Sequence, residues 1–326
     1  KNEKLKKAVE AAKAVSTSKK PATPPKASAT TALTRARDAL SKVLKEDFVV
    51  PLSTDTLRQS MPHIPTGSVI VDYLIGGRPN SYGVAPCPGI PRGRITQLYG
   101  NAGAGKTTLA LTVAAGVCAR GGTVVYIDWE NEVEPRYAAA LGVPIEDASR
   151  FVLLQPETLE QGMKAMIIMA SEGVDLIVVD SVGAGTPSDF YNREVDKEGD
   201  FGRMGLVAQK WSVFLPKFKS ILSRSNTALI GISQLRKTMN GMGMGPDSAP
   251  QGGEAWKFYS SVRIMLRVFS KENGKVLNGV TGKVEEMPTG AVVKVKLEKC
   301  KVSDSVHQEQ KFYLRSGTGI DNTRSV

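Results

Sequence analysis

The hydrophobic positions of the chain form short continuous runs separated by segments with helical spacing. Four such runs are bounded by turn or polar residues: Thr123–Ile127, Phe151–Leu154, Leu176–Val179 and Ala228–Ile232. Continuous apolar runs without alternation are typical of parallel strands that are buried on both faces of a sheet. The intervening amphipathic segments complete a β-α-β-α alternation, which predicts an α/β fold with a doubly wound, mostly parallel sheet.

The pattern becomes β-rich after Gly253. Apolar or alternating stretches there include Val262–Val268, Val292–Leu297 and Lys311–Leu314. We expect these strands to extend the same sheet with antiparallel members.

The amino-terminal part of the chain has a different character from this core. Residues 1–32 are rich in Lys, Ala, Ser, Thr and Pro, and they predict a basic disordered tail. Residues 33–64 are expected to form an oligomerisation segment, with an amphipathic helix over Thr34–Leu44 and an extended stretch after it. Residues 65–321 then form the predicted core, and residues 322–326 a short carboxy-terminal tail.

Charge and composition narrow the class of partner. The formal net charge of the 326 residues is +11, which favours a polyanionic partner, with nucleic acid ahead of a membrane surface. Eight lysines and two glutamates lie within residues 1–32, so about six of these charges belong to the tail and the core is only mildly basic. No apolar run reaches 18 residues, so we expect no membrane span. The three cysteines show no C-x-x-C spacing, which fits a reducing compartment.

Residues 100–107 read GNAGAGKT, a complete G-x-x-x-x-G-K-[ST] phosphate-binding loop. The loop lies between a strand-like segment, Ile95–Tyr99, and a helix predicted over Thr108–Arg120. Glycines let backbone N–H groups converge on a phosphate, and the helix amino terminus adds its positive dipole end. We expect this segment to bind ATP with Mg²⁺ through Gly100, Gly103, Gly105, Lys106, Thr107 and Thr108.

Three strand ends carry polar side chains suited to catalysis. Asp180 ends the run Leu176–Val179, and with Thr107 it is the predicted magnesium ligand. Asp128 and Glu130 follow the strand that ends at Ile127; Glu130 is the candidate base for the attacking water, although both acids could instead cap a loop. Gln234 ends the next strand, where an amide can report the γ-phosphate. Lys106, Glu130, Asp180 and Gln234 are therefore the predicted catalytic set.

The order and spacing of these parts resemble the bacterial RecA recombinase family across Thr34 to Asp321. The matching stretches include Thr66-Gly67-Ser68, Ile127-Asp128-Trp129-Glu130, Pro135-Arg136-Tyr137-Ala138, Val178-Val179-Asp180-Ser181-Val182, Met204-Gly205-Leu206, Ser225-Asn226-Thr227, Gln234-Leu235-Arg236, Gly252-Gly253 and Lys257-Phe258-Tyr259-Ser260-Ser261-Val262-Arg263. The resemblance implies a RecA-type P-loop ATPase core. It also implies a DNA-dependent ATPase that forms helical filaments on single-stranded DNA and catalyses pairing and strand exchange with double-stranded DNA.

Further residue roles follow from the resemblance alone. It implies that Tyr137 stacks on adenine, with Glu134 near the exocyclic amine where relatives usually have Asp. It implies that Lys299 and Lys301 reach the ATP of a neighbouring subunit. The segments 186–204 and 236–254 correspond to DNA-binding loops, and the implied DNA contacts are Met204, Ser212, Arg236, Gly252 and Gly253.

The chain departs from the family pattern at three DNA-contact positions. Gln209 and Pro216 stand where the family generally has arginine, and Glu254 stands where Asn is usual. The chain also stops soon after Asp321, where cellular relatives continue into a small domain, which suggests a phage-type or otherwise compact member, or a truncated chain. Its expected location is the cytoplasm of a bacterial or phage-infected cell.

Two other functions compete with this one. A hexameric helicase or motor ATPase with the same fold would use an arginine finger, whereas the residues expected to act on a neighbour here are lysines. A non-catalytic nucleotide-binding regulator is disfavoured by the intact Lys106, Glu130 and Asp180.

Overall fold

The computed structural model describes residues 29–44, 58–191, 201–237, 248–277, 282–305 and 308–325. The chain divides into two compact units, residues 1–53 and 54–326. The described part of the first unit is helix α2 (Ala29–Leu44), which begins five residues before the predicted start at Thr34. The helix therefore takes in the last residues of the predicted disordered tail, because Ala29, Ala32 and Leu33 favour helix. Residues 1–28 and the predicted extended stretch 48–52 lie outside the described residues.

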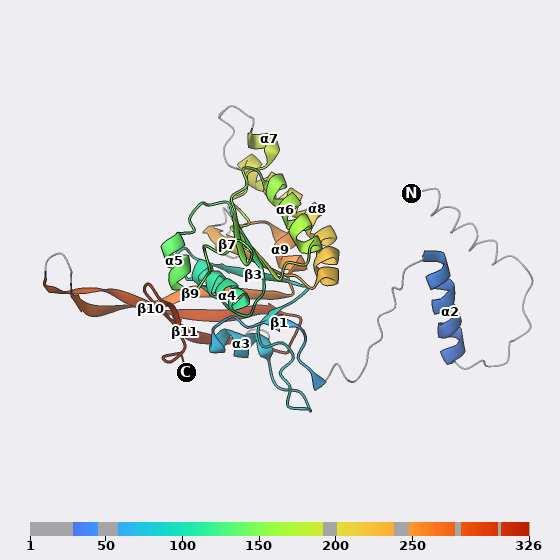
Figure 1. The fold of residues 1–326 in the computed structure, drawn as a ribbon, viewed down its shortest axis with the longest axis horizontal. Helices are drawn as coiled ribbons and strands as arrows, with labels where there is room; N and C mark the ends of the chain where they lie inside the picture. Colours follow the sequence, from blue (N-terminus) through green and yellow to red (C-terminus); the bar gives the residue numbers. More distant parts are fainter. Residues whose placement is uncertain are drawn as a thin grey trace, which may run out of the picture. The chain divides into compact units, whose positions relative to one another are not determined.

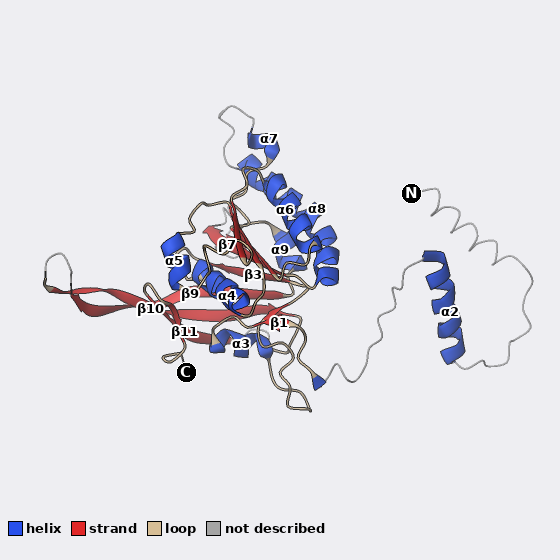
Figure 2. Cartoon of the chain, viewed as in Figure 1, coloured by secondary structure: helices blue, strands red, loops and turns tan. Residues whose placement is uncertain are grey.

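The second unit alternates strands and helices along most of its length (Figures 1 and 2). Its helices are α3 (Val69–Gly76), α4 (Lys106–Ala119), α5 (Pro135–Ala140), α6 (Leu159–Ser171), α7 (Ser188–Tyr191), α8 (Phe201–Ser225) and α9 (Glu254–Tyr259). Its strands are β1 (His63–Ile64), β2 (Ile90–Pro91), β3 (Ile95–Gly100), β4 (Val124–Asp128), β5 (Phe151–Leu154), β6 (Leu176–Asp180), β7 (Ala228–Lys237), β8 (Ser248–Pro250), β9 (Val262–Leu277), β10 (Val284–Cys300), β11 (Glu309–Arg315) and β12 (Gly319–Asp321).

One large mixed sheet organises the unit, with strand order β12-β11-β10-β9-β3-β7-β6-β4-β5. The six strands from β9 to β5 pair in parallel. Strands β10, β11 and β12 add antiparallel pairs at the other edge. This arrangement confirms the predicted doubly wound sheet with antiparallel carboxy-terminal strands.

Both faces of the parallel strands are buried. In β4, Val124 and Tyr126 belong to the core beneath α3 and α4, whereas Val125 and Ile127 belong to the core beneath α6, α8 and α9. Because successive side chains of a strand point to opposite faces, a strand covered on both sides needs an apolar residue at every position. Helices on the two faces of the sheet are visible in Figure 1.

The carboxyl ends of β3, β4, β6 and β7 meet at one edge of the sheet. Gly100 of β3 pairs with Gln234 of β7, and Asp128 of β4 pairs with Asp180 of β6. The predicted chemistry-bearing residues are therefore brought together by register, since parallel neighbours end at the same edge.

Strands β9 and β10 continue past the sheet as a two-stranded ribbon. β11 pairs with β10 only from Gly290 onward, whereas β9 and β10 pair as far as Leu277 and Val284. The ribbon projects from the body in Figure 2.

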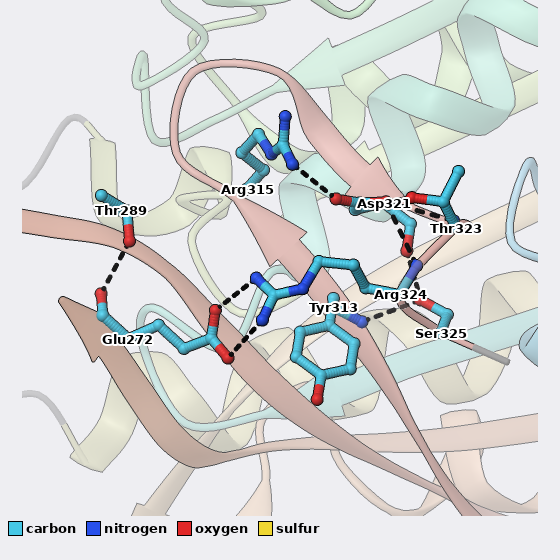
Figure 3. Close-up of polar contacts among 8 residues, drawn as sticks. All are labelled: Glu272, Thr289, Tyr313, Arg315, Asp321, Thr323, Arg324 and Ser325. Atoms are coloured by element: carbon cyan, nitrogen blue, oxygen red, sulfur yellow. Dashed lines mark hydrogen bonds and ion pairs between the residues drawn. The ribbon is translucent and has the colours of Figure 1, made fainter. Parts of the chain in front are cut away.

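The end of the described chain is tied to the base of this ribbon (Figure 3). The Arg324 guanidinium donates to both carboxylate oxygens of Glu272, at 2.8 and 3.3 Å, and lies 4.6 Å from the centroid of the Tyr313 ring. Arg315 forms a second ion pair with Asp321, at 3.0 Å. These pairs hold β12 and the residues after it against β9 and β11.

Candidate functional site

The phosphate-binding loop connects β3 to α4, as the motif predicts. Gly103 and Gly105 have φ values of +70° and +81°, a region that favours glycine. At Gly103 no atom lies within 4 Å of the position a Cβ would take, so one side of the loop is open. At Gly105 a Cβ would overlap the side chain of Leu314, because β11 packs against the back of the loop.

Lys106 begins α4 and is largely buried. Its Nζ donates to the backbone oxygens of Asn101 and Gly100, at 2.8 and 3.2 Å, so the ammonium group folds back over the loop. Burial lowers the pKa of this lysine, and the carboxylates of Asp180 and Glu130 act in the opposite direction. An ammonium group held at a phosphate-binding loop is suited to charge-assisted hydrogen bonds with phosphate oxygens.

Asp180 and Thr107 form the polar pair beside the loop. The Thr107 hydroxyl donates to Oδ2 of Asp180 at 2.8 Å, and the Tyr126 hydroxyl donates to the same oxygen at 2.7 Å. The pKa of Asp180 is raised to about 6, chiefly by burial; the hydrogen bonds from Tyr126 and Thr107 lower it, and the nearby carboxylates of Glu130 and Asp128 add to the rise. The site therefore concentrates negative charge that a cation would stabilise.

The donor set at this pair fits magnesium. Among the described residues, no group of three or more His, Cys, Asp and Glu side chains could hold a metal. Mg²⁺ is usually bound by one or two protein oxygens, with water and phosphate oxygens at its other positions. One carboxylate and one hydroxyl, Asp180 and Thr107, match that requirement.

Glu130 lies at the centre of a second cluster. The Ser181 hydroxyl donates to its Oε1, and the Gln234 amide donates to Oε1 and Oε2 at 3.2 and 3.0 Å. Asp128 differs: its carboxylate accepts from the backbone N–H groups of Glu130 and Val133, both at 3.1 Å. Asp128 thus stabilises the loop, whereas the Glu130 carboxylate is held by side chains at the strand ends.

Ser181 and Tyr126 are residues of this cluster to which the sequence pattern assigned no role. Ser181 directly follows the candidate metal ligand Asp180, and Tyr126 lies two residues before Asp128 on the same face of β4. Two features of the sequence could have indicated these residues: Ser181 is next to a candidate metal ligand, and Tyr126 lies on the same strand face as Asp128.

Helix α5 packs beside the loop. Glu134 caps its amino terminus by accepting from the Tyr137 backbone N–H at 2.6 Å, and Pro135 occupies the first turn. The Tyr137 hydroxyl bonds Thr108 Oγ1 of α4 at 2.9 Å. Two residues implied for adenine binding are therefore within reach of the phosphate loop, and Glu134 also stabilises the helix that carries Tyr137.

Lys299 and Lys301 lie away from this cluster. Lys299 pairs with Arg263 in the sheet, and the Lys301 N–H donates to Ser261 at the start of β9. This is the amino-terminal end of β3 and β9, whereas the phosphate loop follows the carboxyl end of β3. The structure therefore does not bring either lysine to the phosphate loop of the same chain.

Lys299 is instead bound locally. Its Nζ donates to the backbone oxygens of Lys257 and Phe258, at 2.7 and 2.9 Å, at the end of α9. Partial burial lowers the pKa of Lys299 to about 8, with nearby cations, Lys301 first among them, acting in the same direction. Lys301 is exposed.

The residues implied for DNA contact come from three elements. Met204 and Ser212 lie on α8, so the segment 186–204, predicted as a loop, is helical at its end and in the short helix α7. The end becomes helical because Trp211 and other apolar residues of α8 bury against the sheet. Arg236 is the last residue but one of β7, and its Nη1 lies 3.2 Å from Met204 Sδ.

Gly252 and Gly253 precede α9 and pack against the same region. A Cβ at Gly252 would lie 2.6 Å from Val182, and one at Gly253 would lie 2.6 Å from Ala208. The Gln251 N–H donates to the Gln234 carbonyl at 2.9 Å, which ties this segment to the strand that carries the candidate sensor. Ser212 is exposed one turn after Ala208. Residues 192–200 and 238–247 of the two predicted loops lie outside the described residues.

A phosphate loop after β3, with carboxylates and an amide at the ends of β4, β6 and β7, defines a P-loop ATPase. Comparison of the sequence with protein families gives a match to the RecA N-terminal domain over residues 31–321. The chain belongs to the RecA family.

Relatives that match most of the chain support the assignment. Protein RecA of Thermus thermophilus is 36% identical over 293 residues, which cover 89% of this chain and 77% of the relative. Protein RecA of Borrelia hermsii is 34% identical over 90% of this chain and 76% of the relative. Protein RecA of Nitratidesulfovibrio vulgaris is 35% identical over 94% of this chain and 78% of the relative.

Family membership confirms the predicted class of activity. The protein is a DNA-dependent ATPase of recombination that binds DNA and forms filaments, and the comparisons give no support to the hexameric helicase alternative. Among the described residues, no helix combines the length and hydropathy needed to span a bilayer.

Proposed function

We propose that the protein binds ATP with Mg²⁺ and assembles on single-stranded DNA. It then pairs that strand with homologous double-stranded DNA in the bacterial or phage-infected cytoplasm. The observation that carries the assignment of the hydrolytic site is the position of Glu130, whose carboxylate is held by Ser181 and Gln234 at the edge of the sheet that carries the phosphate loop.

In this proposal each residue of the set has a separate task. Lys106 exchanges its backbone acceptors for phosphate oxygens, while Thr107 and Asp180 hold Mg²⁺. When bound, Mg²⁺ neutralises charge that develops on the phosphate oxygens. Glu130 orients the attacking water and takes its proton, and Gln234 holds the Glu130 carboxylate in position. Tyr137 stacks on adenine, with Glu134 at the exocyclic amine.

The DNA surface in this proposal is formed by α8, the end of β7 and the segment before α9. It includes Met204, Ser212, Arg236, Gly252 and Gly253, and the contact between Arg236 and Met204 supports a shared surface. If Arg236 contacts a phosphate, Arg236→Ala should weaken binding uniformly across sequences and reduce the salt dependence by about one phosphate contact. Weakening that varies strongly with sequence would instead indicate base recognition.

Assembly requires contacts between subunits. The segment 33–64 is proposed to provide one, since α2 exposes Leu33 and Leu40 to the extent of 73% and 43%. The lysine pair Lys299 and Lys301 is proposed to provide another at a neighbour's nucleotide, because neither lies near the phosphate loop of its own chain.

Electron microscopy with single-stranded DNA and a non-hydrolysable ATP analogue tests the assembly. We expect helical filaments that require both the analogue and DNA. Closed rings would support a hexameric motor, and unassembled subunits would support a nucleotide-binding regulator. Lys106→Ala is the matched control, because loss of the phosphate contact should prevent nucleotide-dependent assembly while the fold remains.

A further inference from the structure

All three tryptophans of the chain pack into one cluster. The ring centroids of Trp129 and Trp211 lie 6.2 Å apart with an interplanar angle of 77°, and those of Trp211 and Trp256 lie 5.0 Å apart at 72°. Both pairs are edge-to-face, an arrangement favoured by the charge distribution of aromatic rings. Trp211 is the central member, because it contacts both of the others.

The three rings come from separate elements that carry proposed site residues. Trp129 directly precedes Glu130 in the loop after β4. Trp211 directly precedes Ser212 on α8, and Trp256 lies on α9, three residues after Gly253. The cluster therefore joins the segment that carries the proposed catalytic carboxylate to two of the three segments that carry the proposed DNA contacts.

The cluster is tightly enclosed by glycines. A Cβ at Gly162 or Gly185 would meet the indole of Trp129, and one at Gly231 would overlap the indole of Trp256. Gly231 lies on β7, three residues before Gln234. Because close-packed interiors leave little free space, a displacement of one ring must move its neighbours.

A hydrogen bond connects the cluster to the metal-binding strand. Trp211 Nε1 donates to the Val182 carbonyl at 2.8 Å. Val182 follows Ser181, whose hydroxyl donates to Glu130. The Trp129 backbone N–H in turn donates to the Asp180 carbonyl at 2.8 Å. Val182 is two residues from Asp180, so this hydrogen bond links Trp211 to the segment that carries the proposed metal ligand.

Two indole donors in the cluster have no acceptor. Nε1 of Trp129 and Nε1 of Trp256 are buried and without a hydrogen-bond partner among the described residues. Trp256 Nε1 lies 3.3 Å from the position that a Cβ would take at Gly252. A buried donor without an acceptor is costly, so an arrangement that pairs either one would compete with the present arrangement.

We propose that Trp211 is a positioning residue that couples the state of Glu130 to the DNA-binding segments, through its contacts with Trp129 and Trp256. The inference rests on the proposed function, because it takes Glu130 as the hydrolytic residue and Met204, Ser212, Gly252 and Gly253 as DNA contacts. Motion of the Glu130 segment moves Trp129, and the edge-to-face contacts pass that motion to α8 and α9 together.

The test compares Trp211→Phe with the native protein. Phenylalanine retains an aromatic ring but removes the donor to Val182. ATP binding and hydrolysis without DNA should remain within about twofold of native values, whereas the stimulation of kcat by single-stranded DNA should fall about tenfold, a typical size for coupling between sites. KM for ATP should be unchanged. Full stimulation in this variant would overturn the proposal.

A matched control separates coupling from stability. Phe218 is fully buried on the same helix and stacks on Phe214, but it makes no ring contact with a tryptophan. Phe218→Leu should therefore lower thermal stability and leave stimulation by DNA intact. An equal loss of stimulation in Phe218→Leu would mean that general loosening of α8 is responsible, and would also overturn the proposal.

A spectroscopic measurement on the native protein needs no variant. Because all three tryptophans belong to the cluster, the intrinsic tryptophan emission reports only on it. We expect the emission to change when an ATP analogue and oligo(dT) are added together, beyond the sum of their separate effects. Emission that is merely additive would overturn the coupling. A native protein without DNA-stimulated hydrolysis, or a fully active Glu130→Gln variant, would instead refute the proposed function itself.

Discussion

The side-chain amide of Gln234 donates to both carboxylate oxygens of Glu130, at 3.0 and 3.2 Å. The two residues are 104 positions apart and meet because β7 and β4 end at the same edge of the sheet. The Gln234 backbone carbonyl also accepts from the backbone N–H of Gln251, so one residue contacts both the carboxylate proposed for hydrolysis and the segment before Gly252. If Gln234 responds to the γ-phosphate, as proposed, a change in one of these contacts should alter the other.

Gln234→Ala should uncouple hydrolysis from DNA. The substitution removes both hydrogen bonds to Glu130 but leaves the phosphate loop and Mg²⁺ ligands intact. We expect ATP affinity to change less than about threefold and stimulation of hydrolysis by DNA to fall at least tenfold. Steady-state hydrolysis with and without single-stranded DNA measures both quantities. Retained stimulation would show that the amide contact has no sensing function.

Lys106→Ala and Glu130→Gln should fail at different steps. Without the Lys106 ammonium, phosphate oxygens lose a charge-assisted contact, so both ATP binding and turnover should be lost. Glu130→Gln keeps the shape of the side chain but removes the base, so the variant should bind ATP, remain on DNA and turn over at least a hundredfold more slowly. Nucleotide binding and turnover are measured separately for each variant. Near-native turnover by Glu130→Gln would exclude Glu130 as the base.

Asp180→Asn should stabilise the nucleotide-free protein while abolishing Mg²⁺-dependent hydrolysis. The folded pKa of Asp180 is raised to about 6 from 3.8, so ionisation at pH 7 costs about 3 kcal/mol of folding free energy. The neutral amide does not carry this cost.

The raised pKa of Asp180 determines how this contribution to stability changes with pH. The cost is fully present above the folded pKa of about 6 and is absent below the unfolded pKa of 3.8. The stability advantage of Asp180→Asn over the native protein without nucleotide should therefore shrink as the pH falls from 7 toward 4. Thermal denaturation of both proteins at several pH values measures this difference. If the stability difference between the native protein and Asp180→Asn did not change with pH, burial would not raise the pKa of the Asp180 carboxyl.

Replacing Lys299 and Lys301 together by Ala should abolish DNA-stimulated hydrolysis while each isolated subunit still binds ATP. The pair lies at the opposite end of β3 from its own phosphate loop, so only a neighbour's nucleotide is available to it. Native activity should also rise cooperatively with protein concentration and DNA length.

Mixing two inactive variants tests whether the lysine pair acts at the nucleotide of a neighbouring subunit or only within its own subunit. In filaments that combine the double-lysine variant with Lys106→Ala, some interfaces unite an intact phosphate loop with an intact lysine pair. Partial recovery of hydrolysis is expected. Absence of recovery despite co-assembly, or full activity of the double-lysine variant alone, would refute a site shared between subunits. A local function in holding the end of α9 would then explain the Lys299 contacts.

Deletion of residues 1–28 should weaken non-specific DNA binding. The segment contains eight lysines and two glutamates, and its removal leaves α2 complete. Binding at low salt should decrease and its salt dependence should become shallower, because fewer counterions are released from DNA. ATP affinity serves as the internal control. An unchanged salt slope would show that this segment does not contact phosphates.

The sequence by itself determined the parts of this protein that depend on local pattern. The phosphate loop, its flanking strand and helix, and Asp180 at the end of β6 are contiguous or periodic features, and each was found where predicted. The apolar runs also predicted the parallel sheet, because a strand buried on both faces requires an apolar side chain at every position. The resemblance to the RecA family depended on the spacing of these same parts.

Only the tertiary structure decided which residues from distant parts of the chain contact one another at the site. The sequence favoured Glu130 over Asp128 as the base, but only the structure shows that the two differ in their contacts. Backbone N–H groups of Glu130 and Val133 donate to Asp128, whereas the side chains of Ser181 and Gln234 donate to Glu130. The contacts of Trp129 and Trp256 with Trp211 could not be predicted from the sequence either, because the spacing of the three tryptophans along the chain carries no periodic signal. Strand order and register set these contacts, and both are fixed by packing across the whole sheet rather than by any local segment.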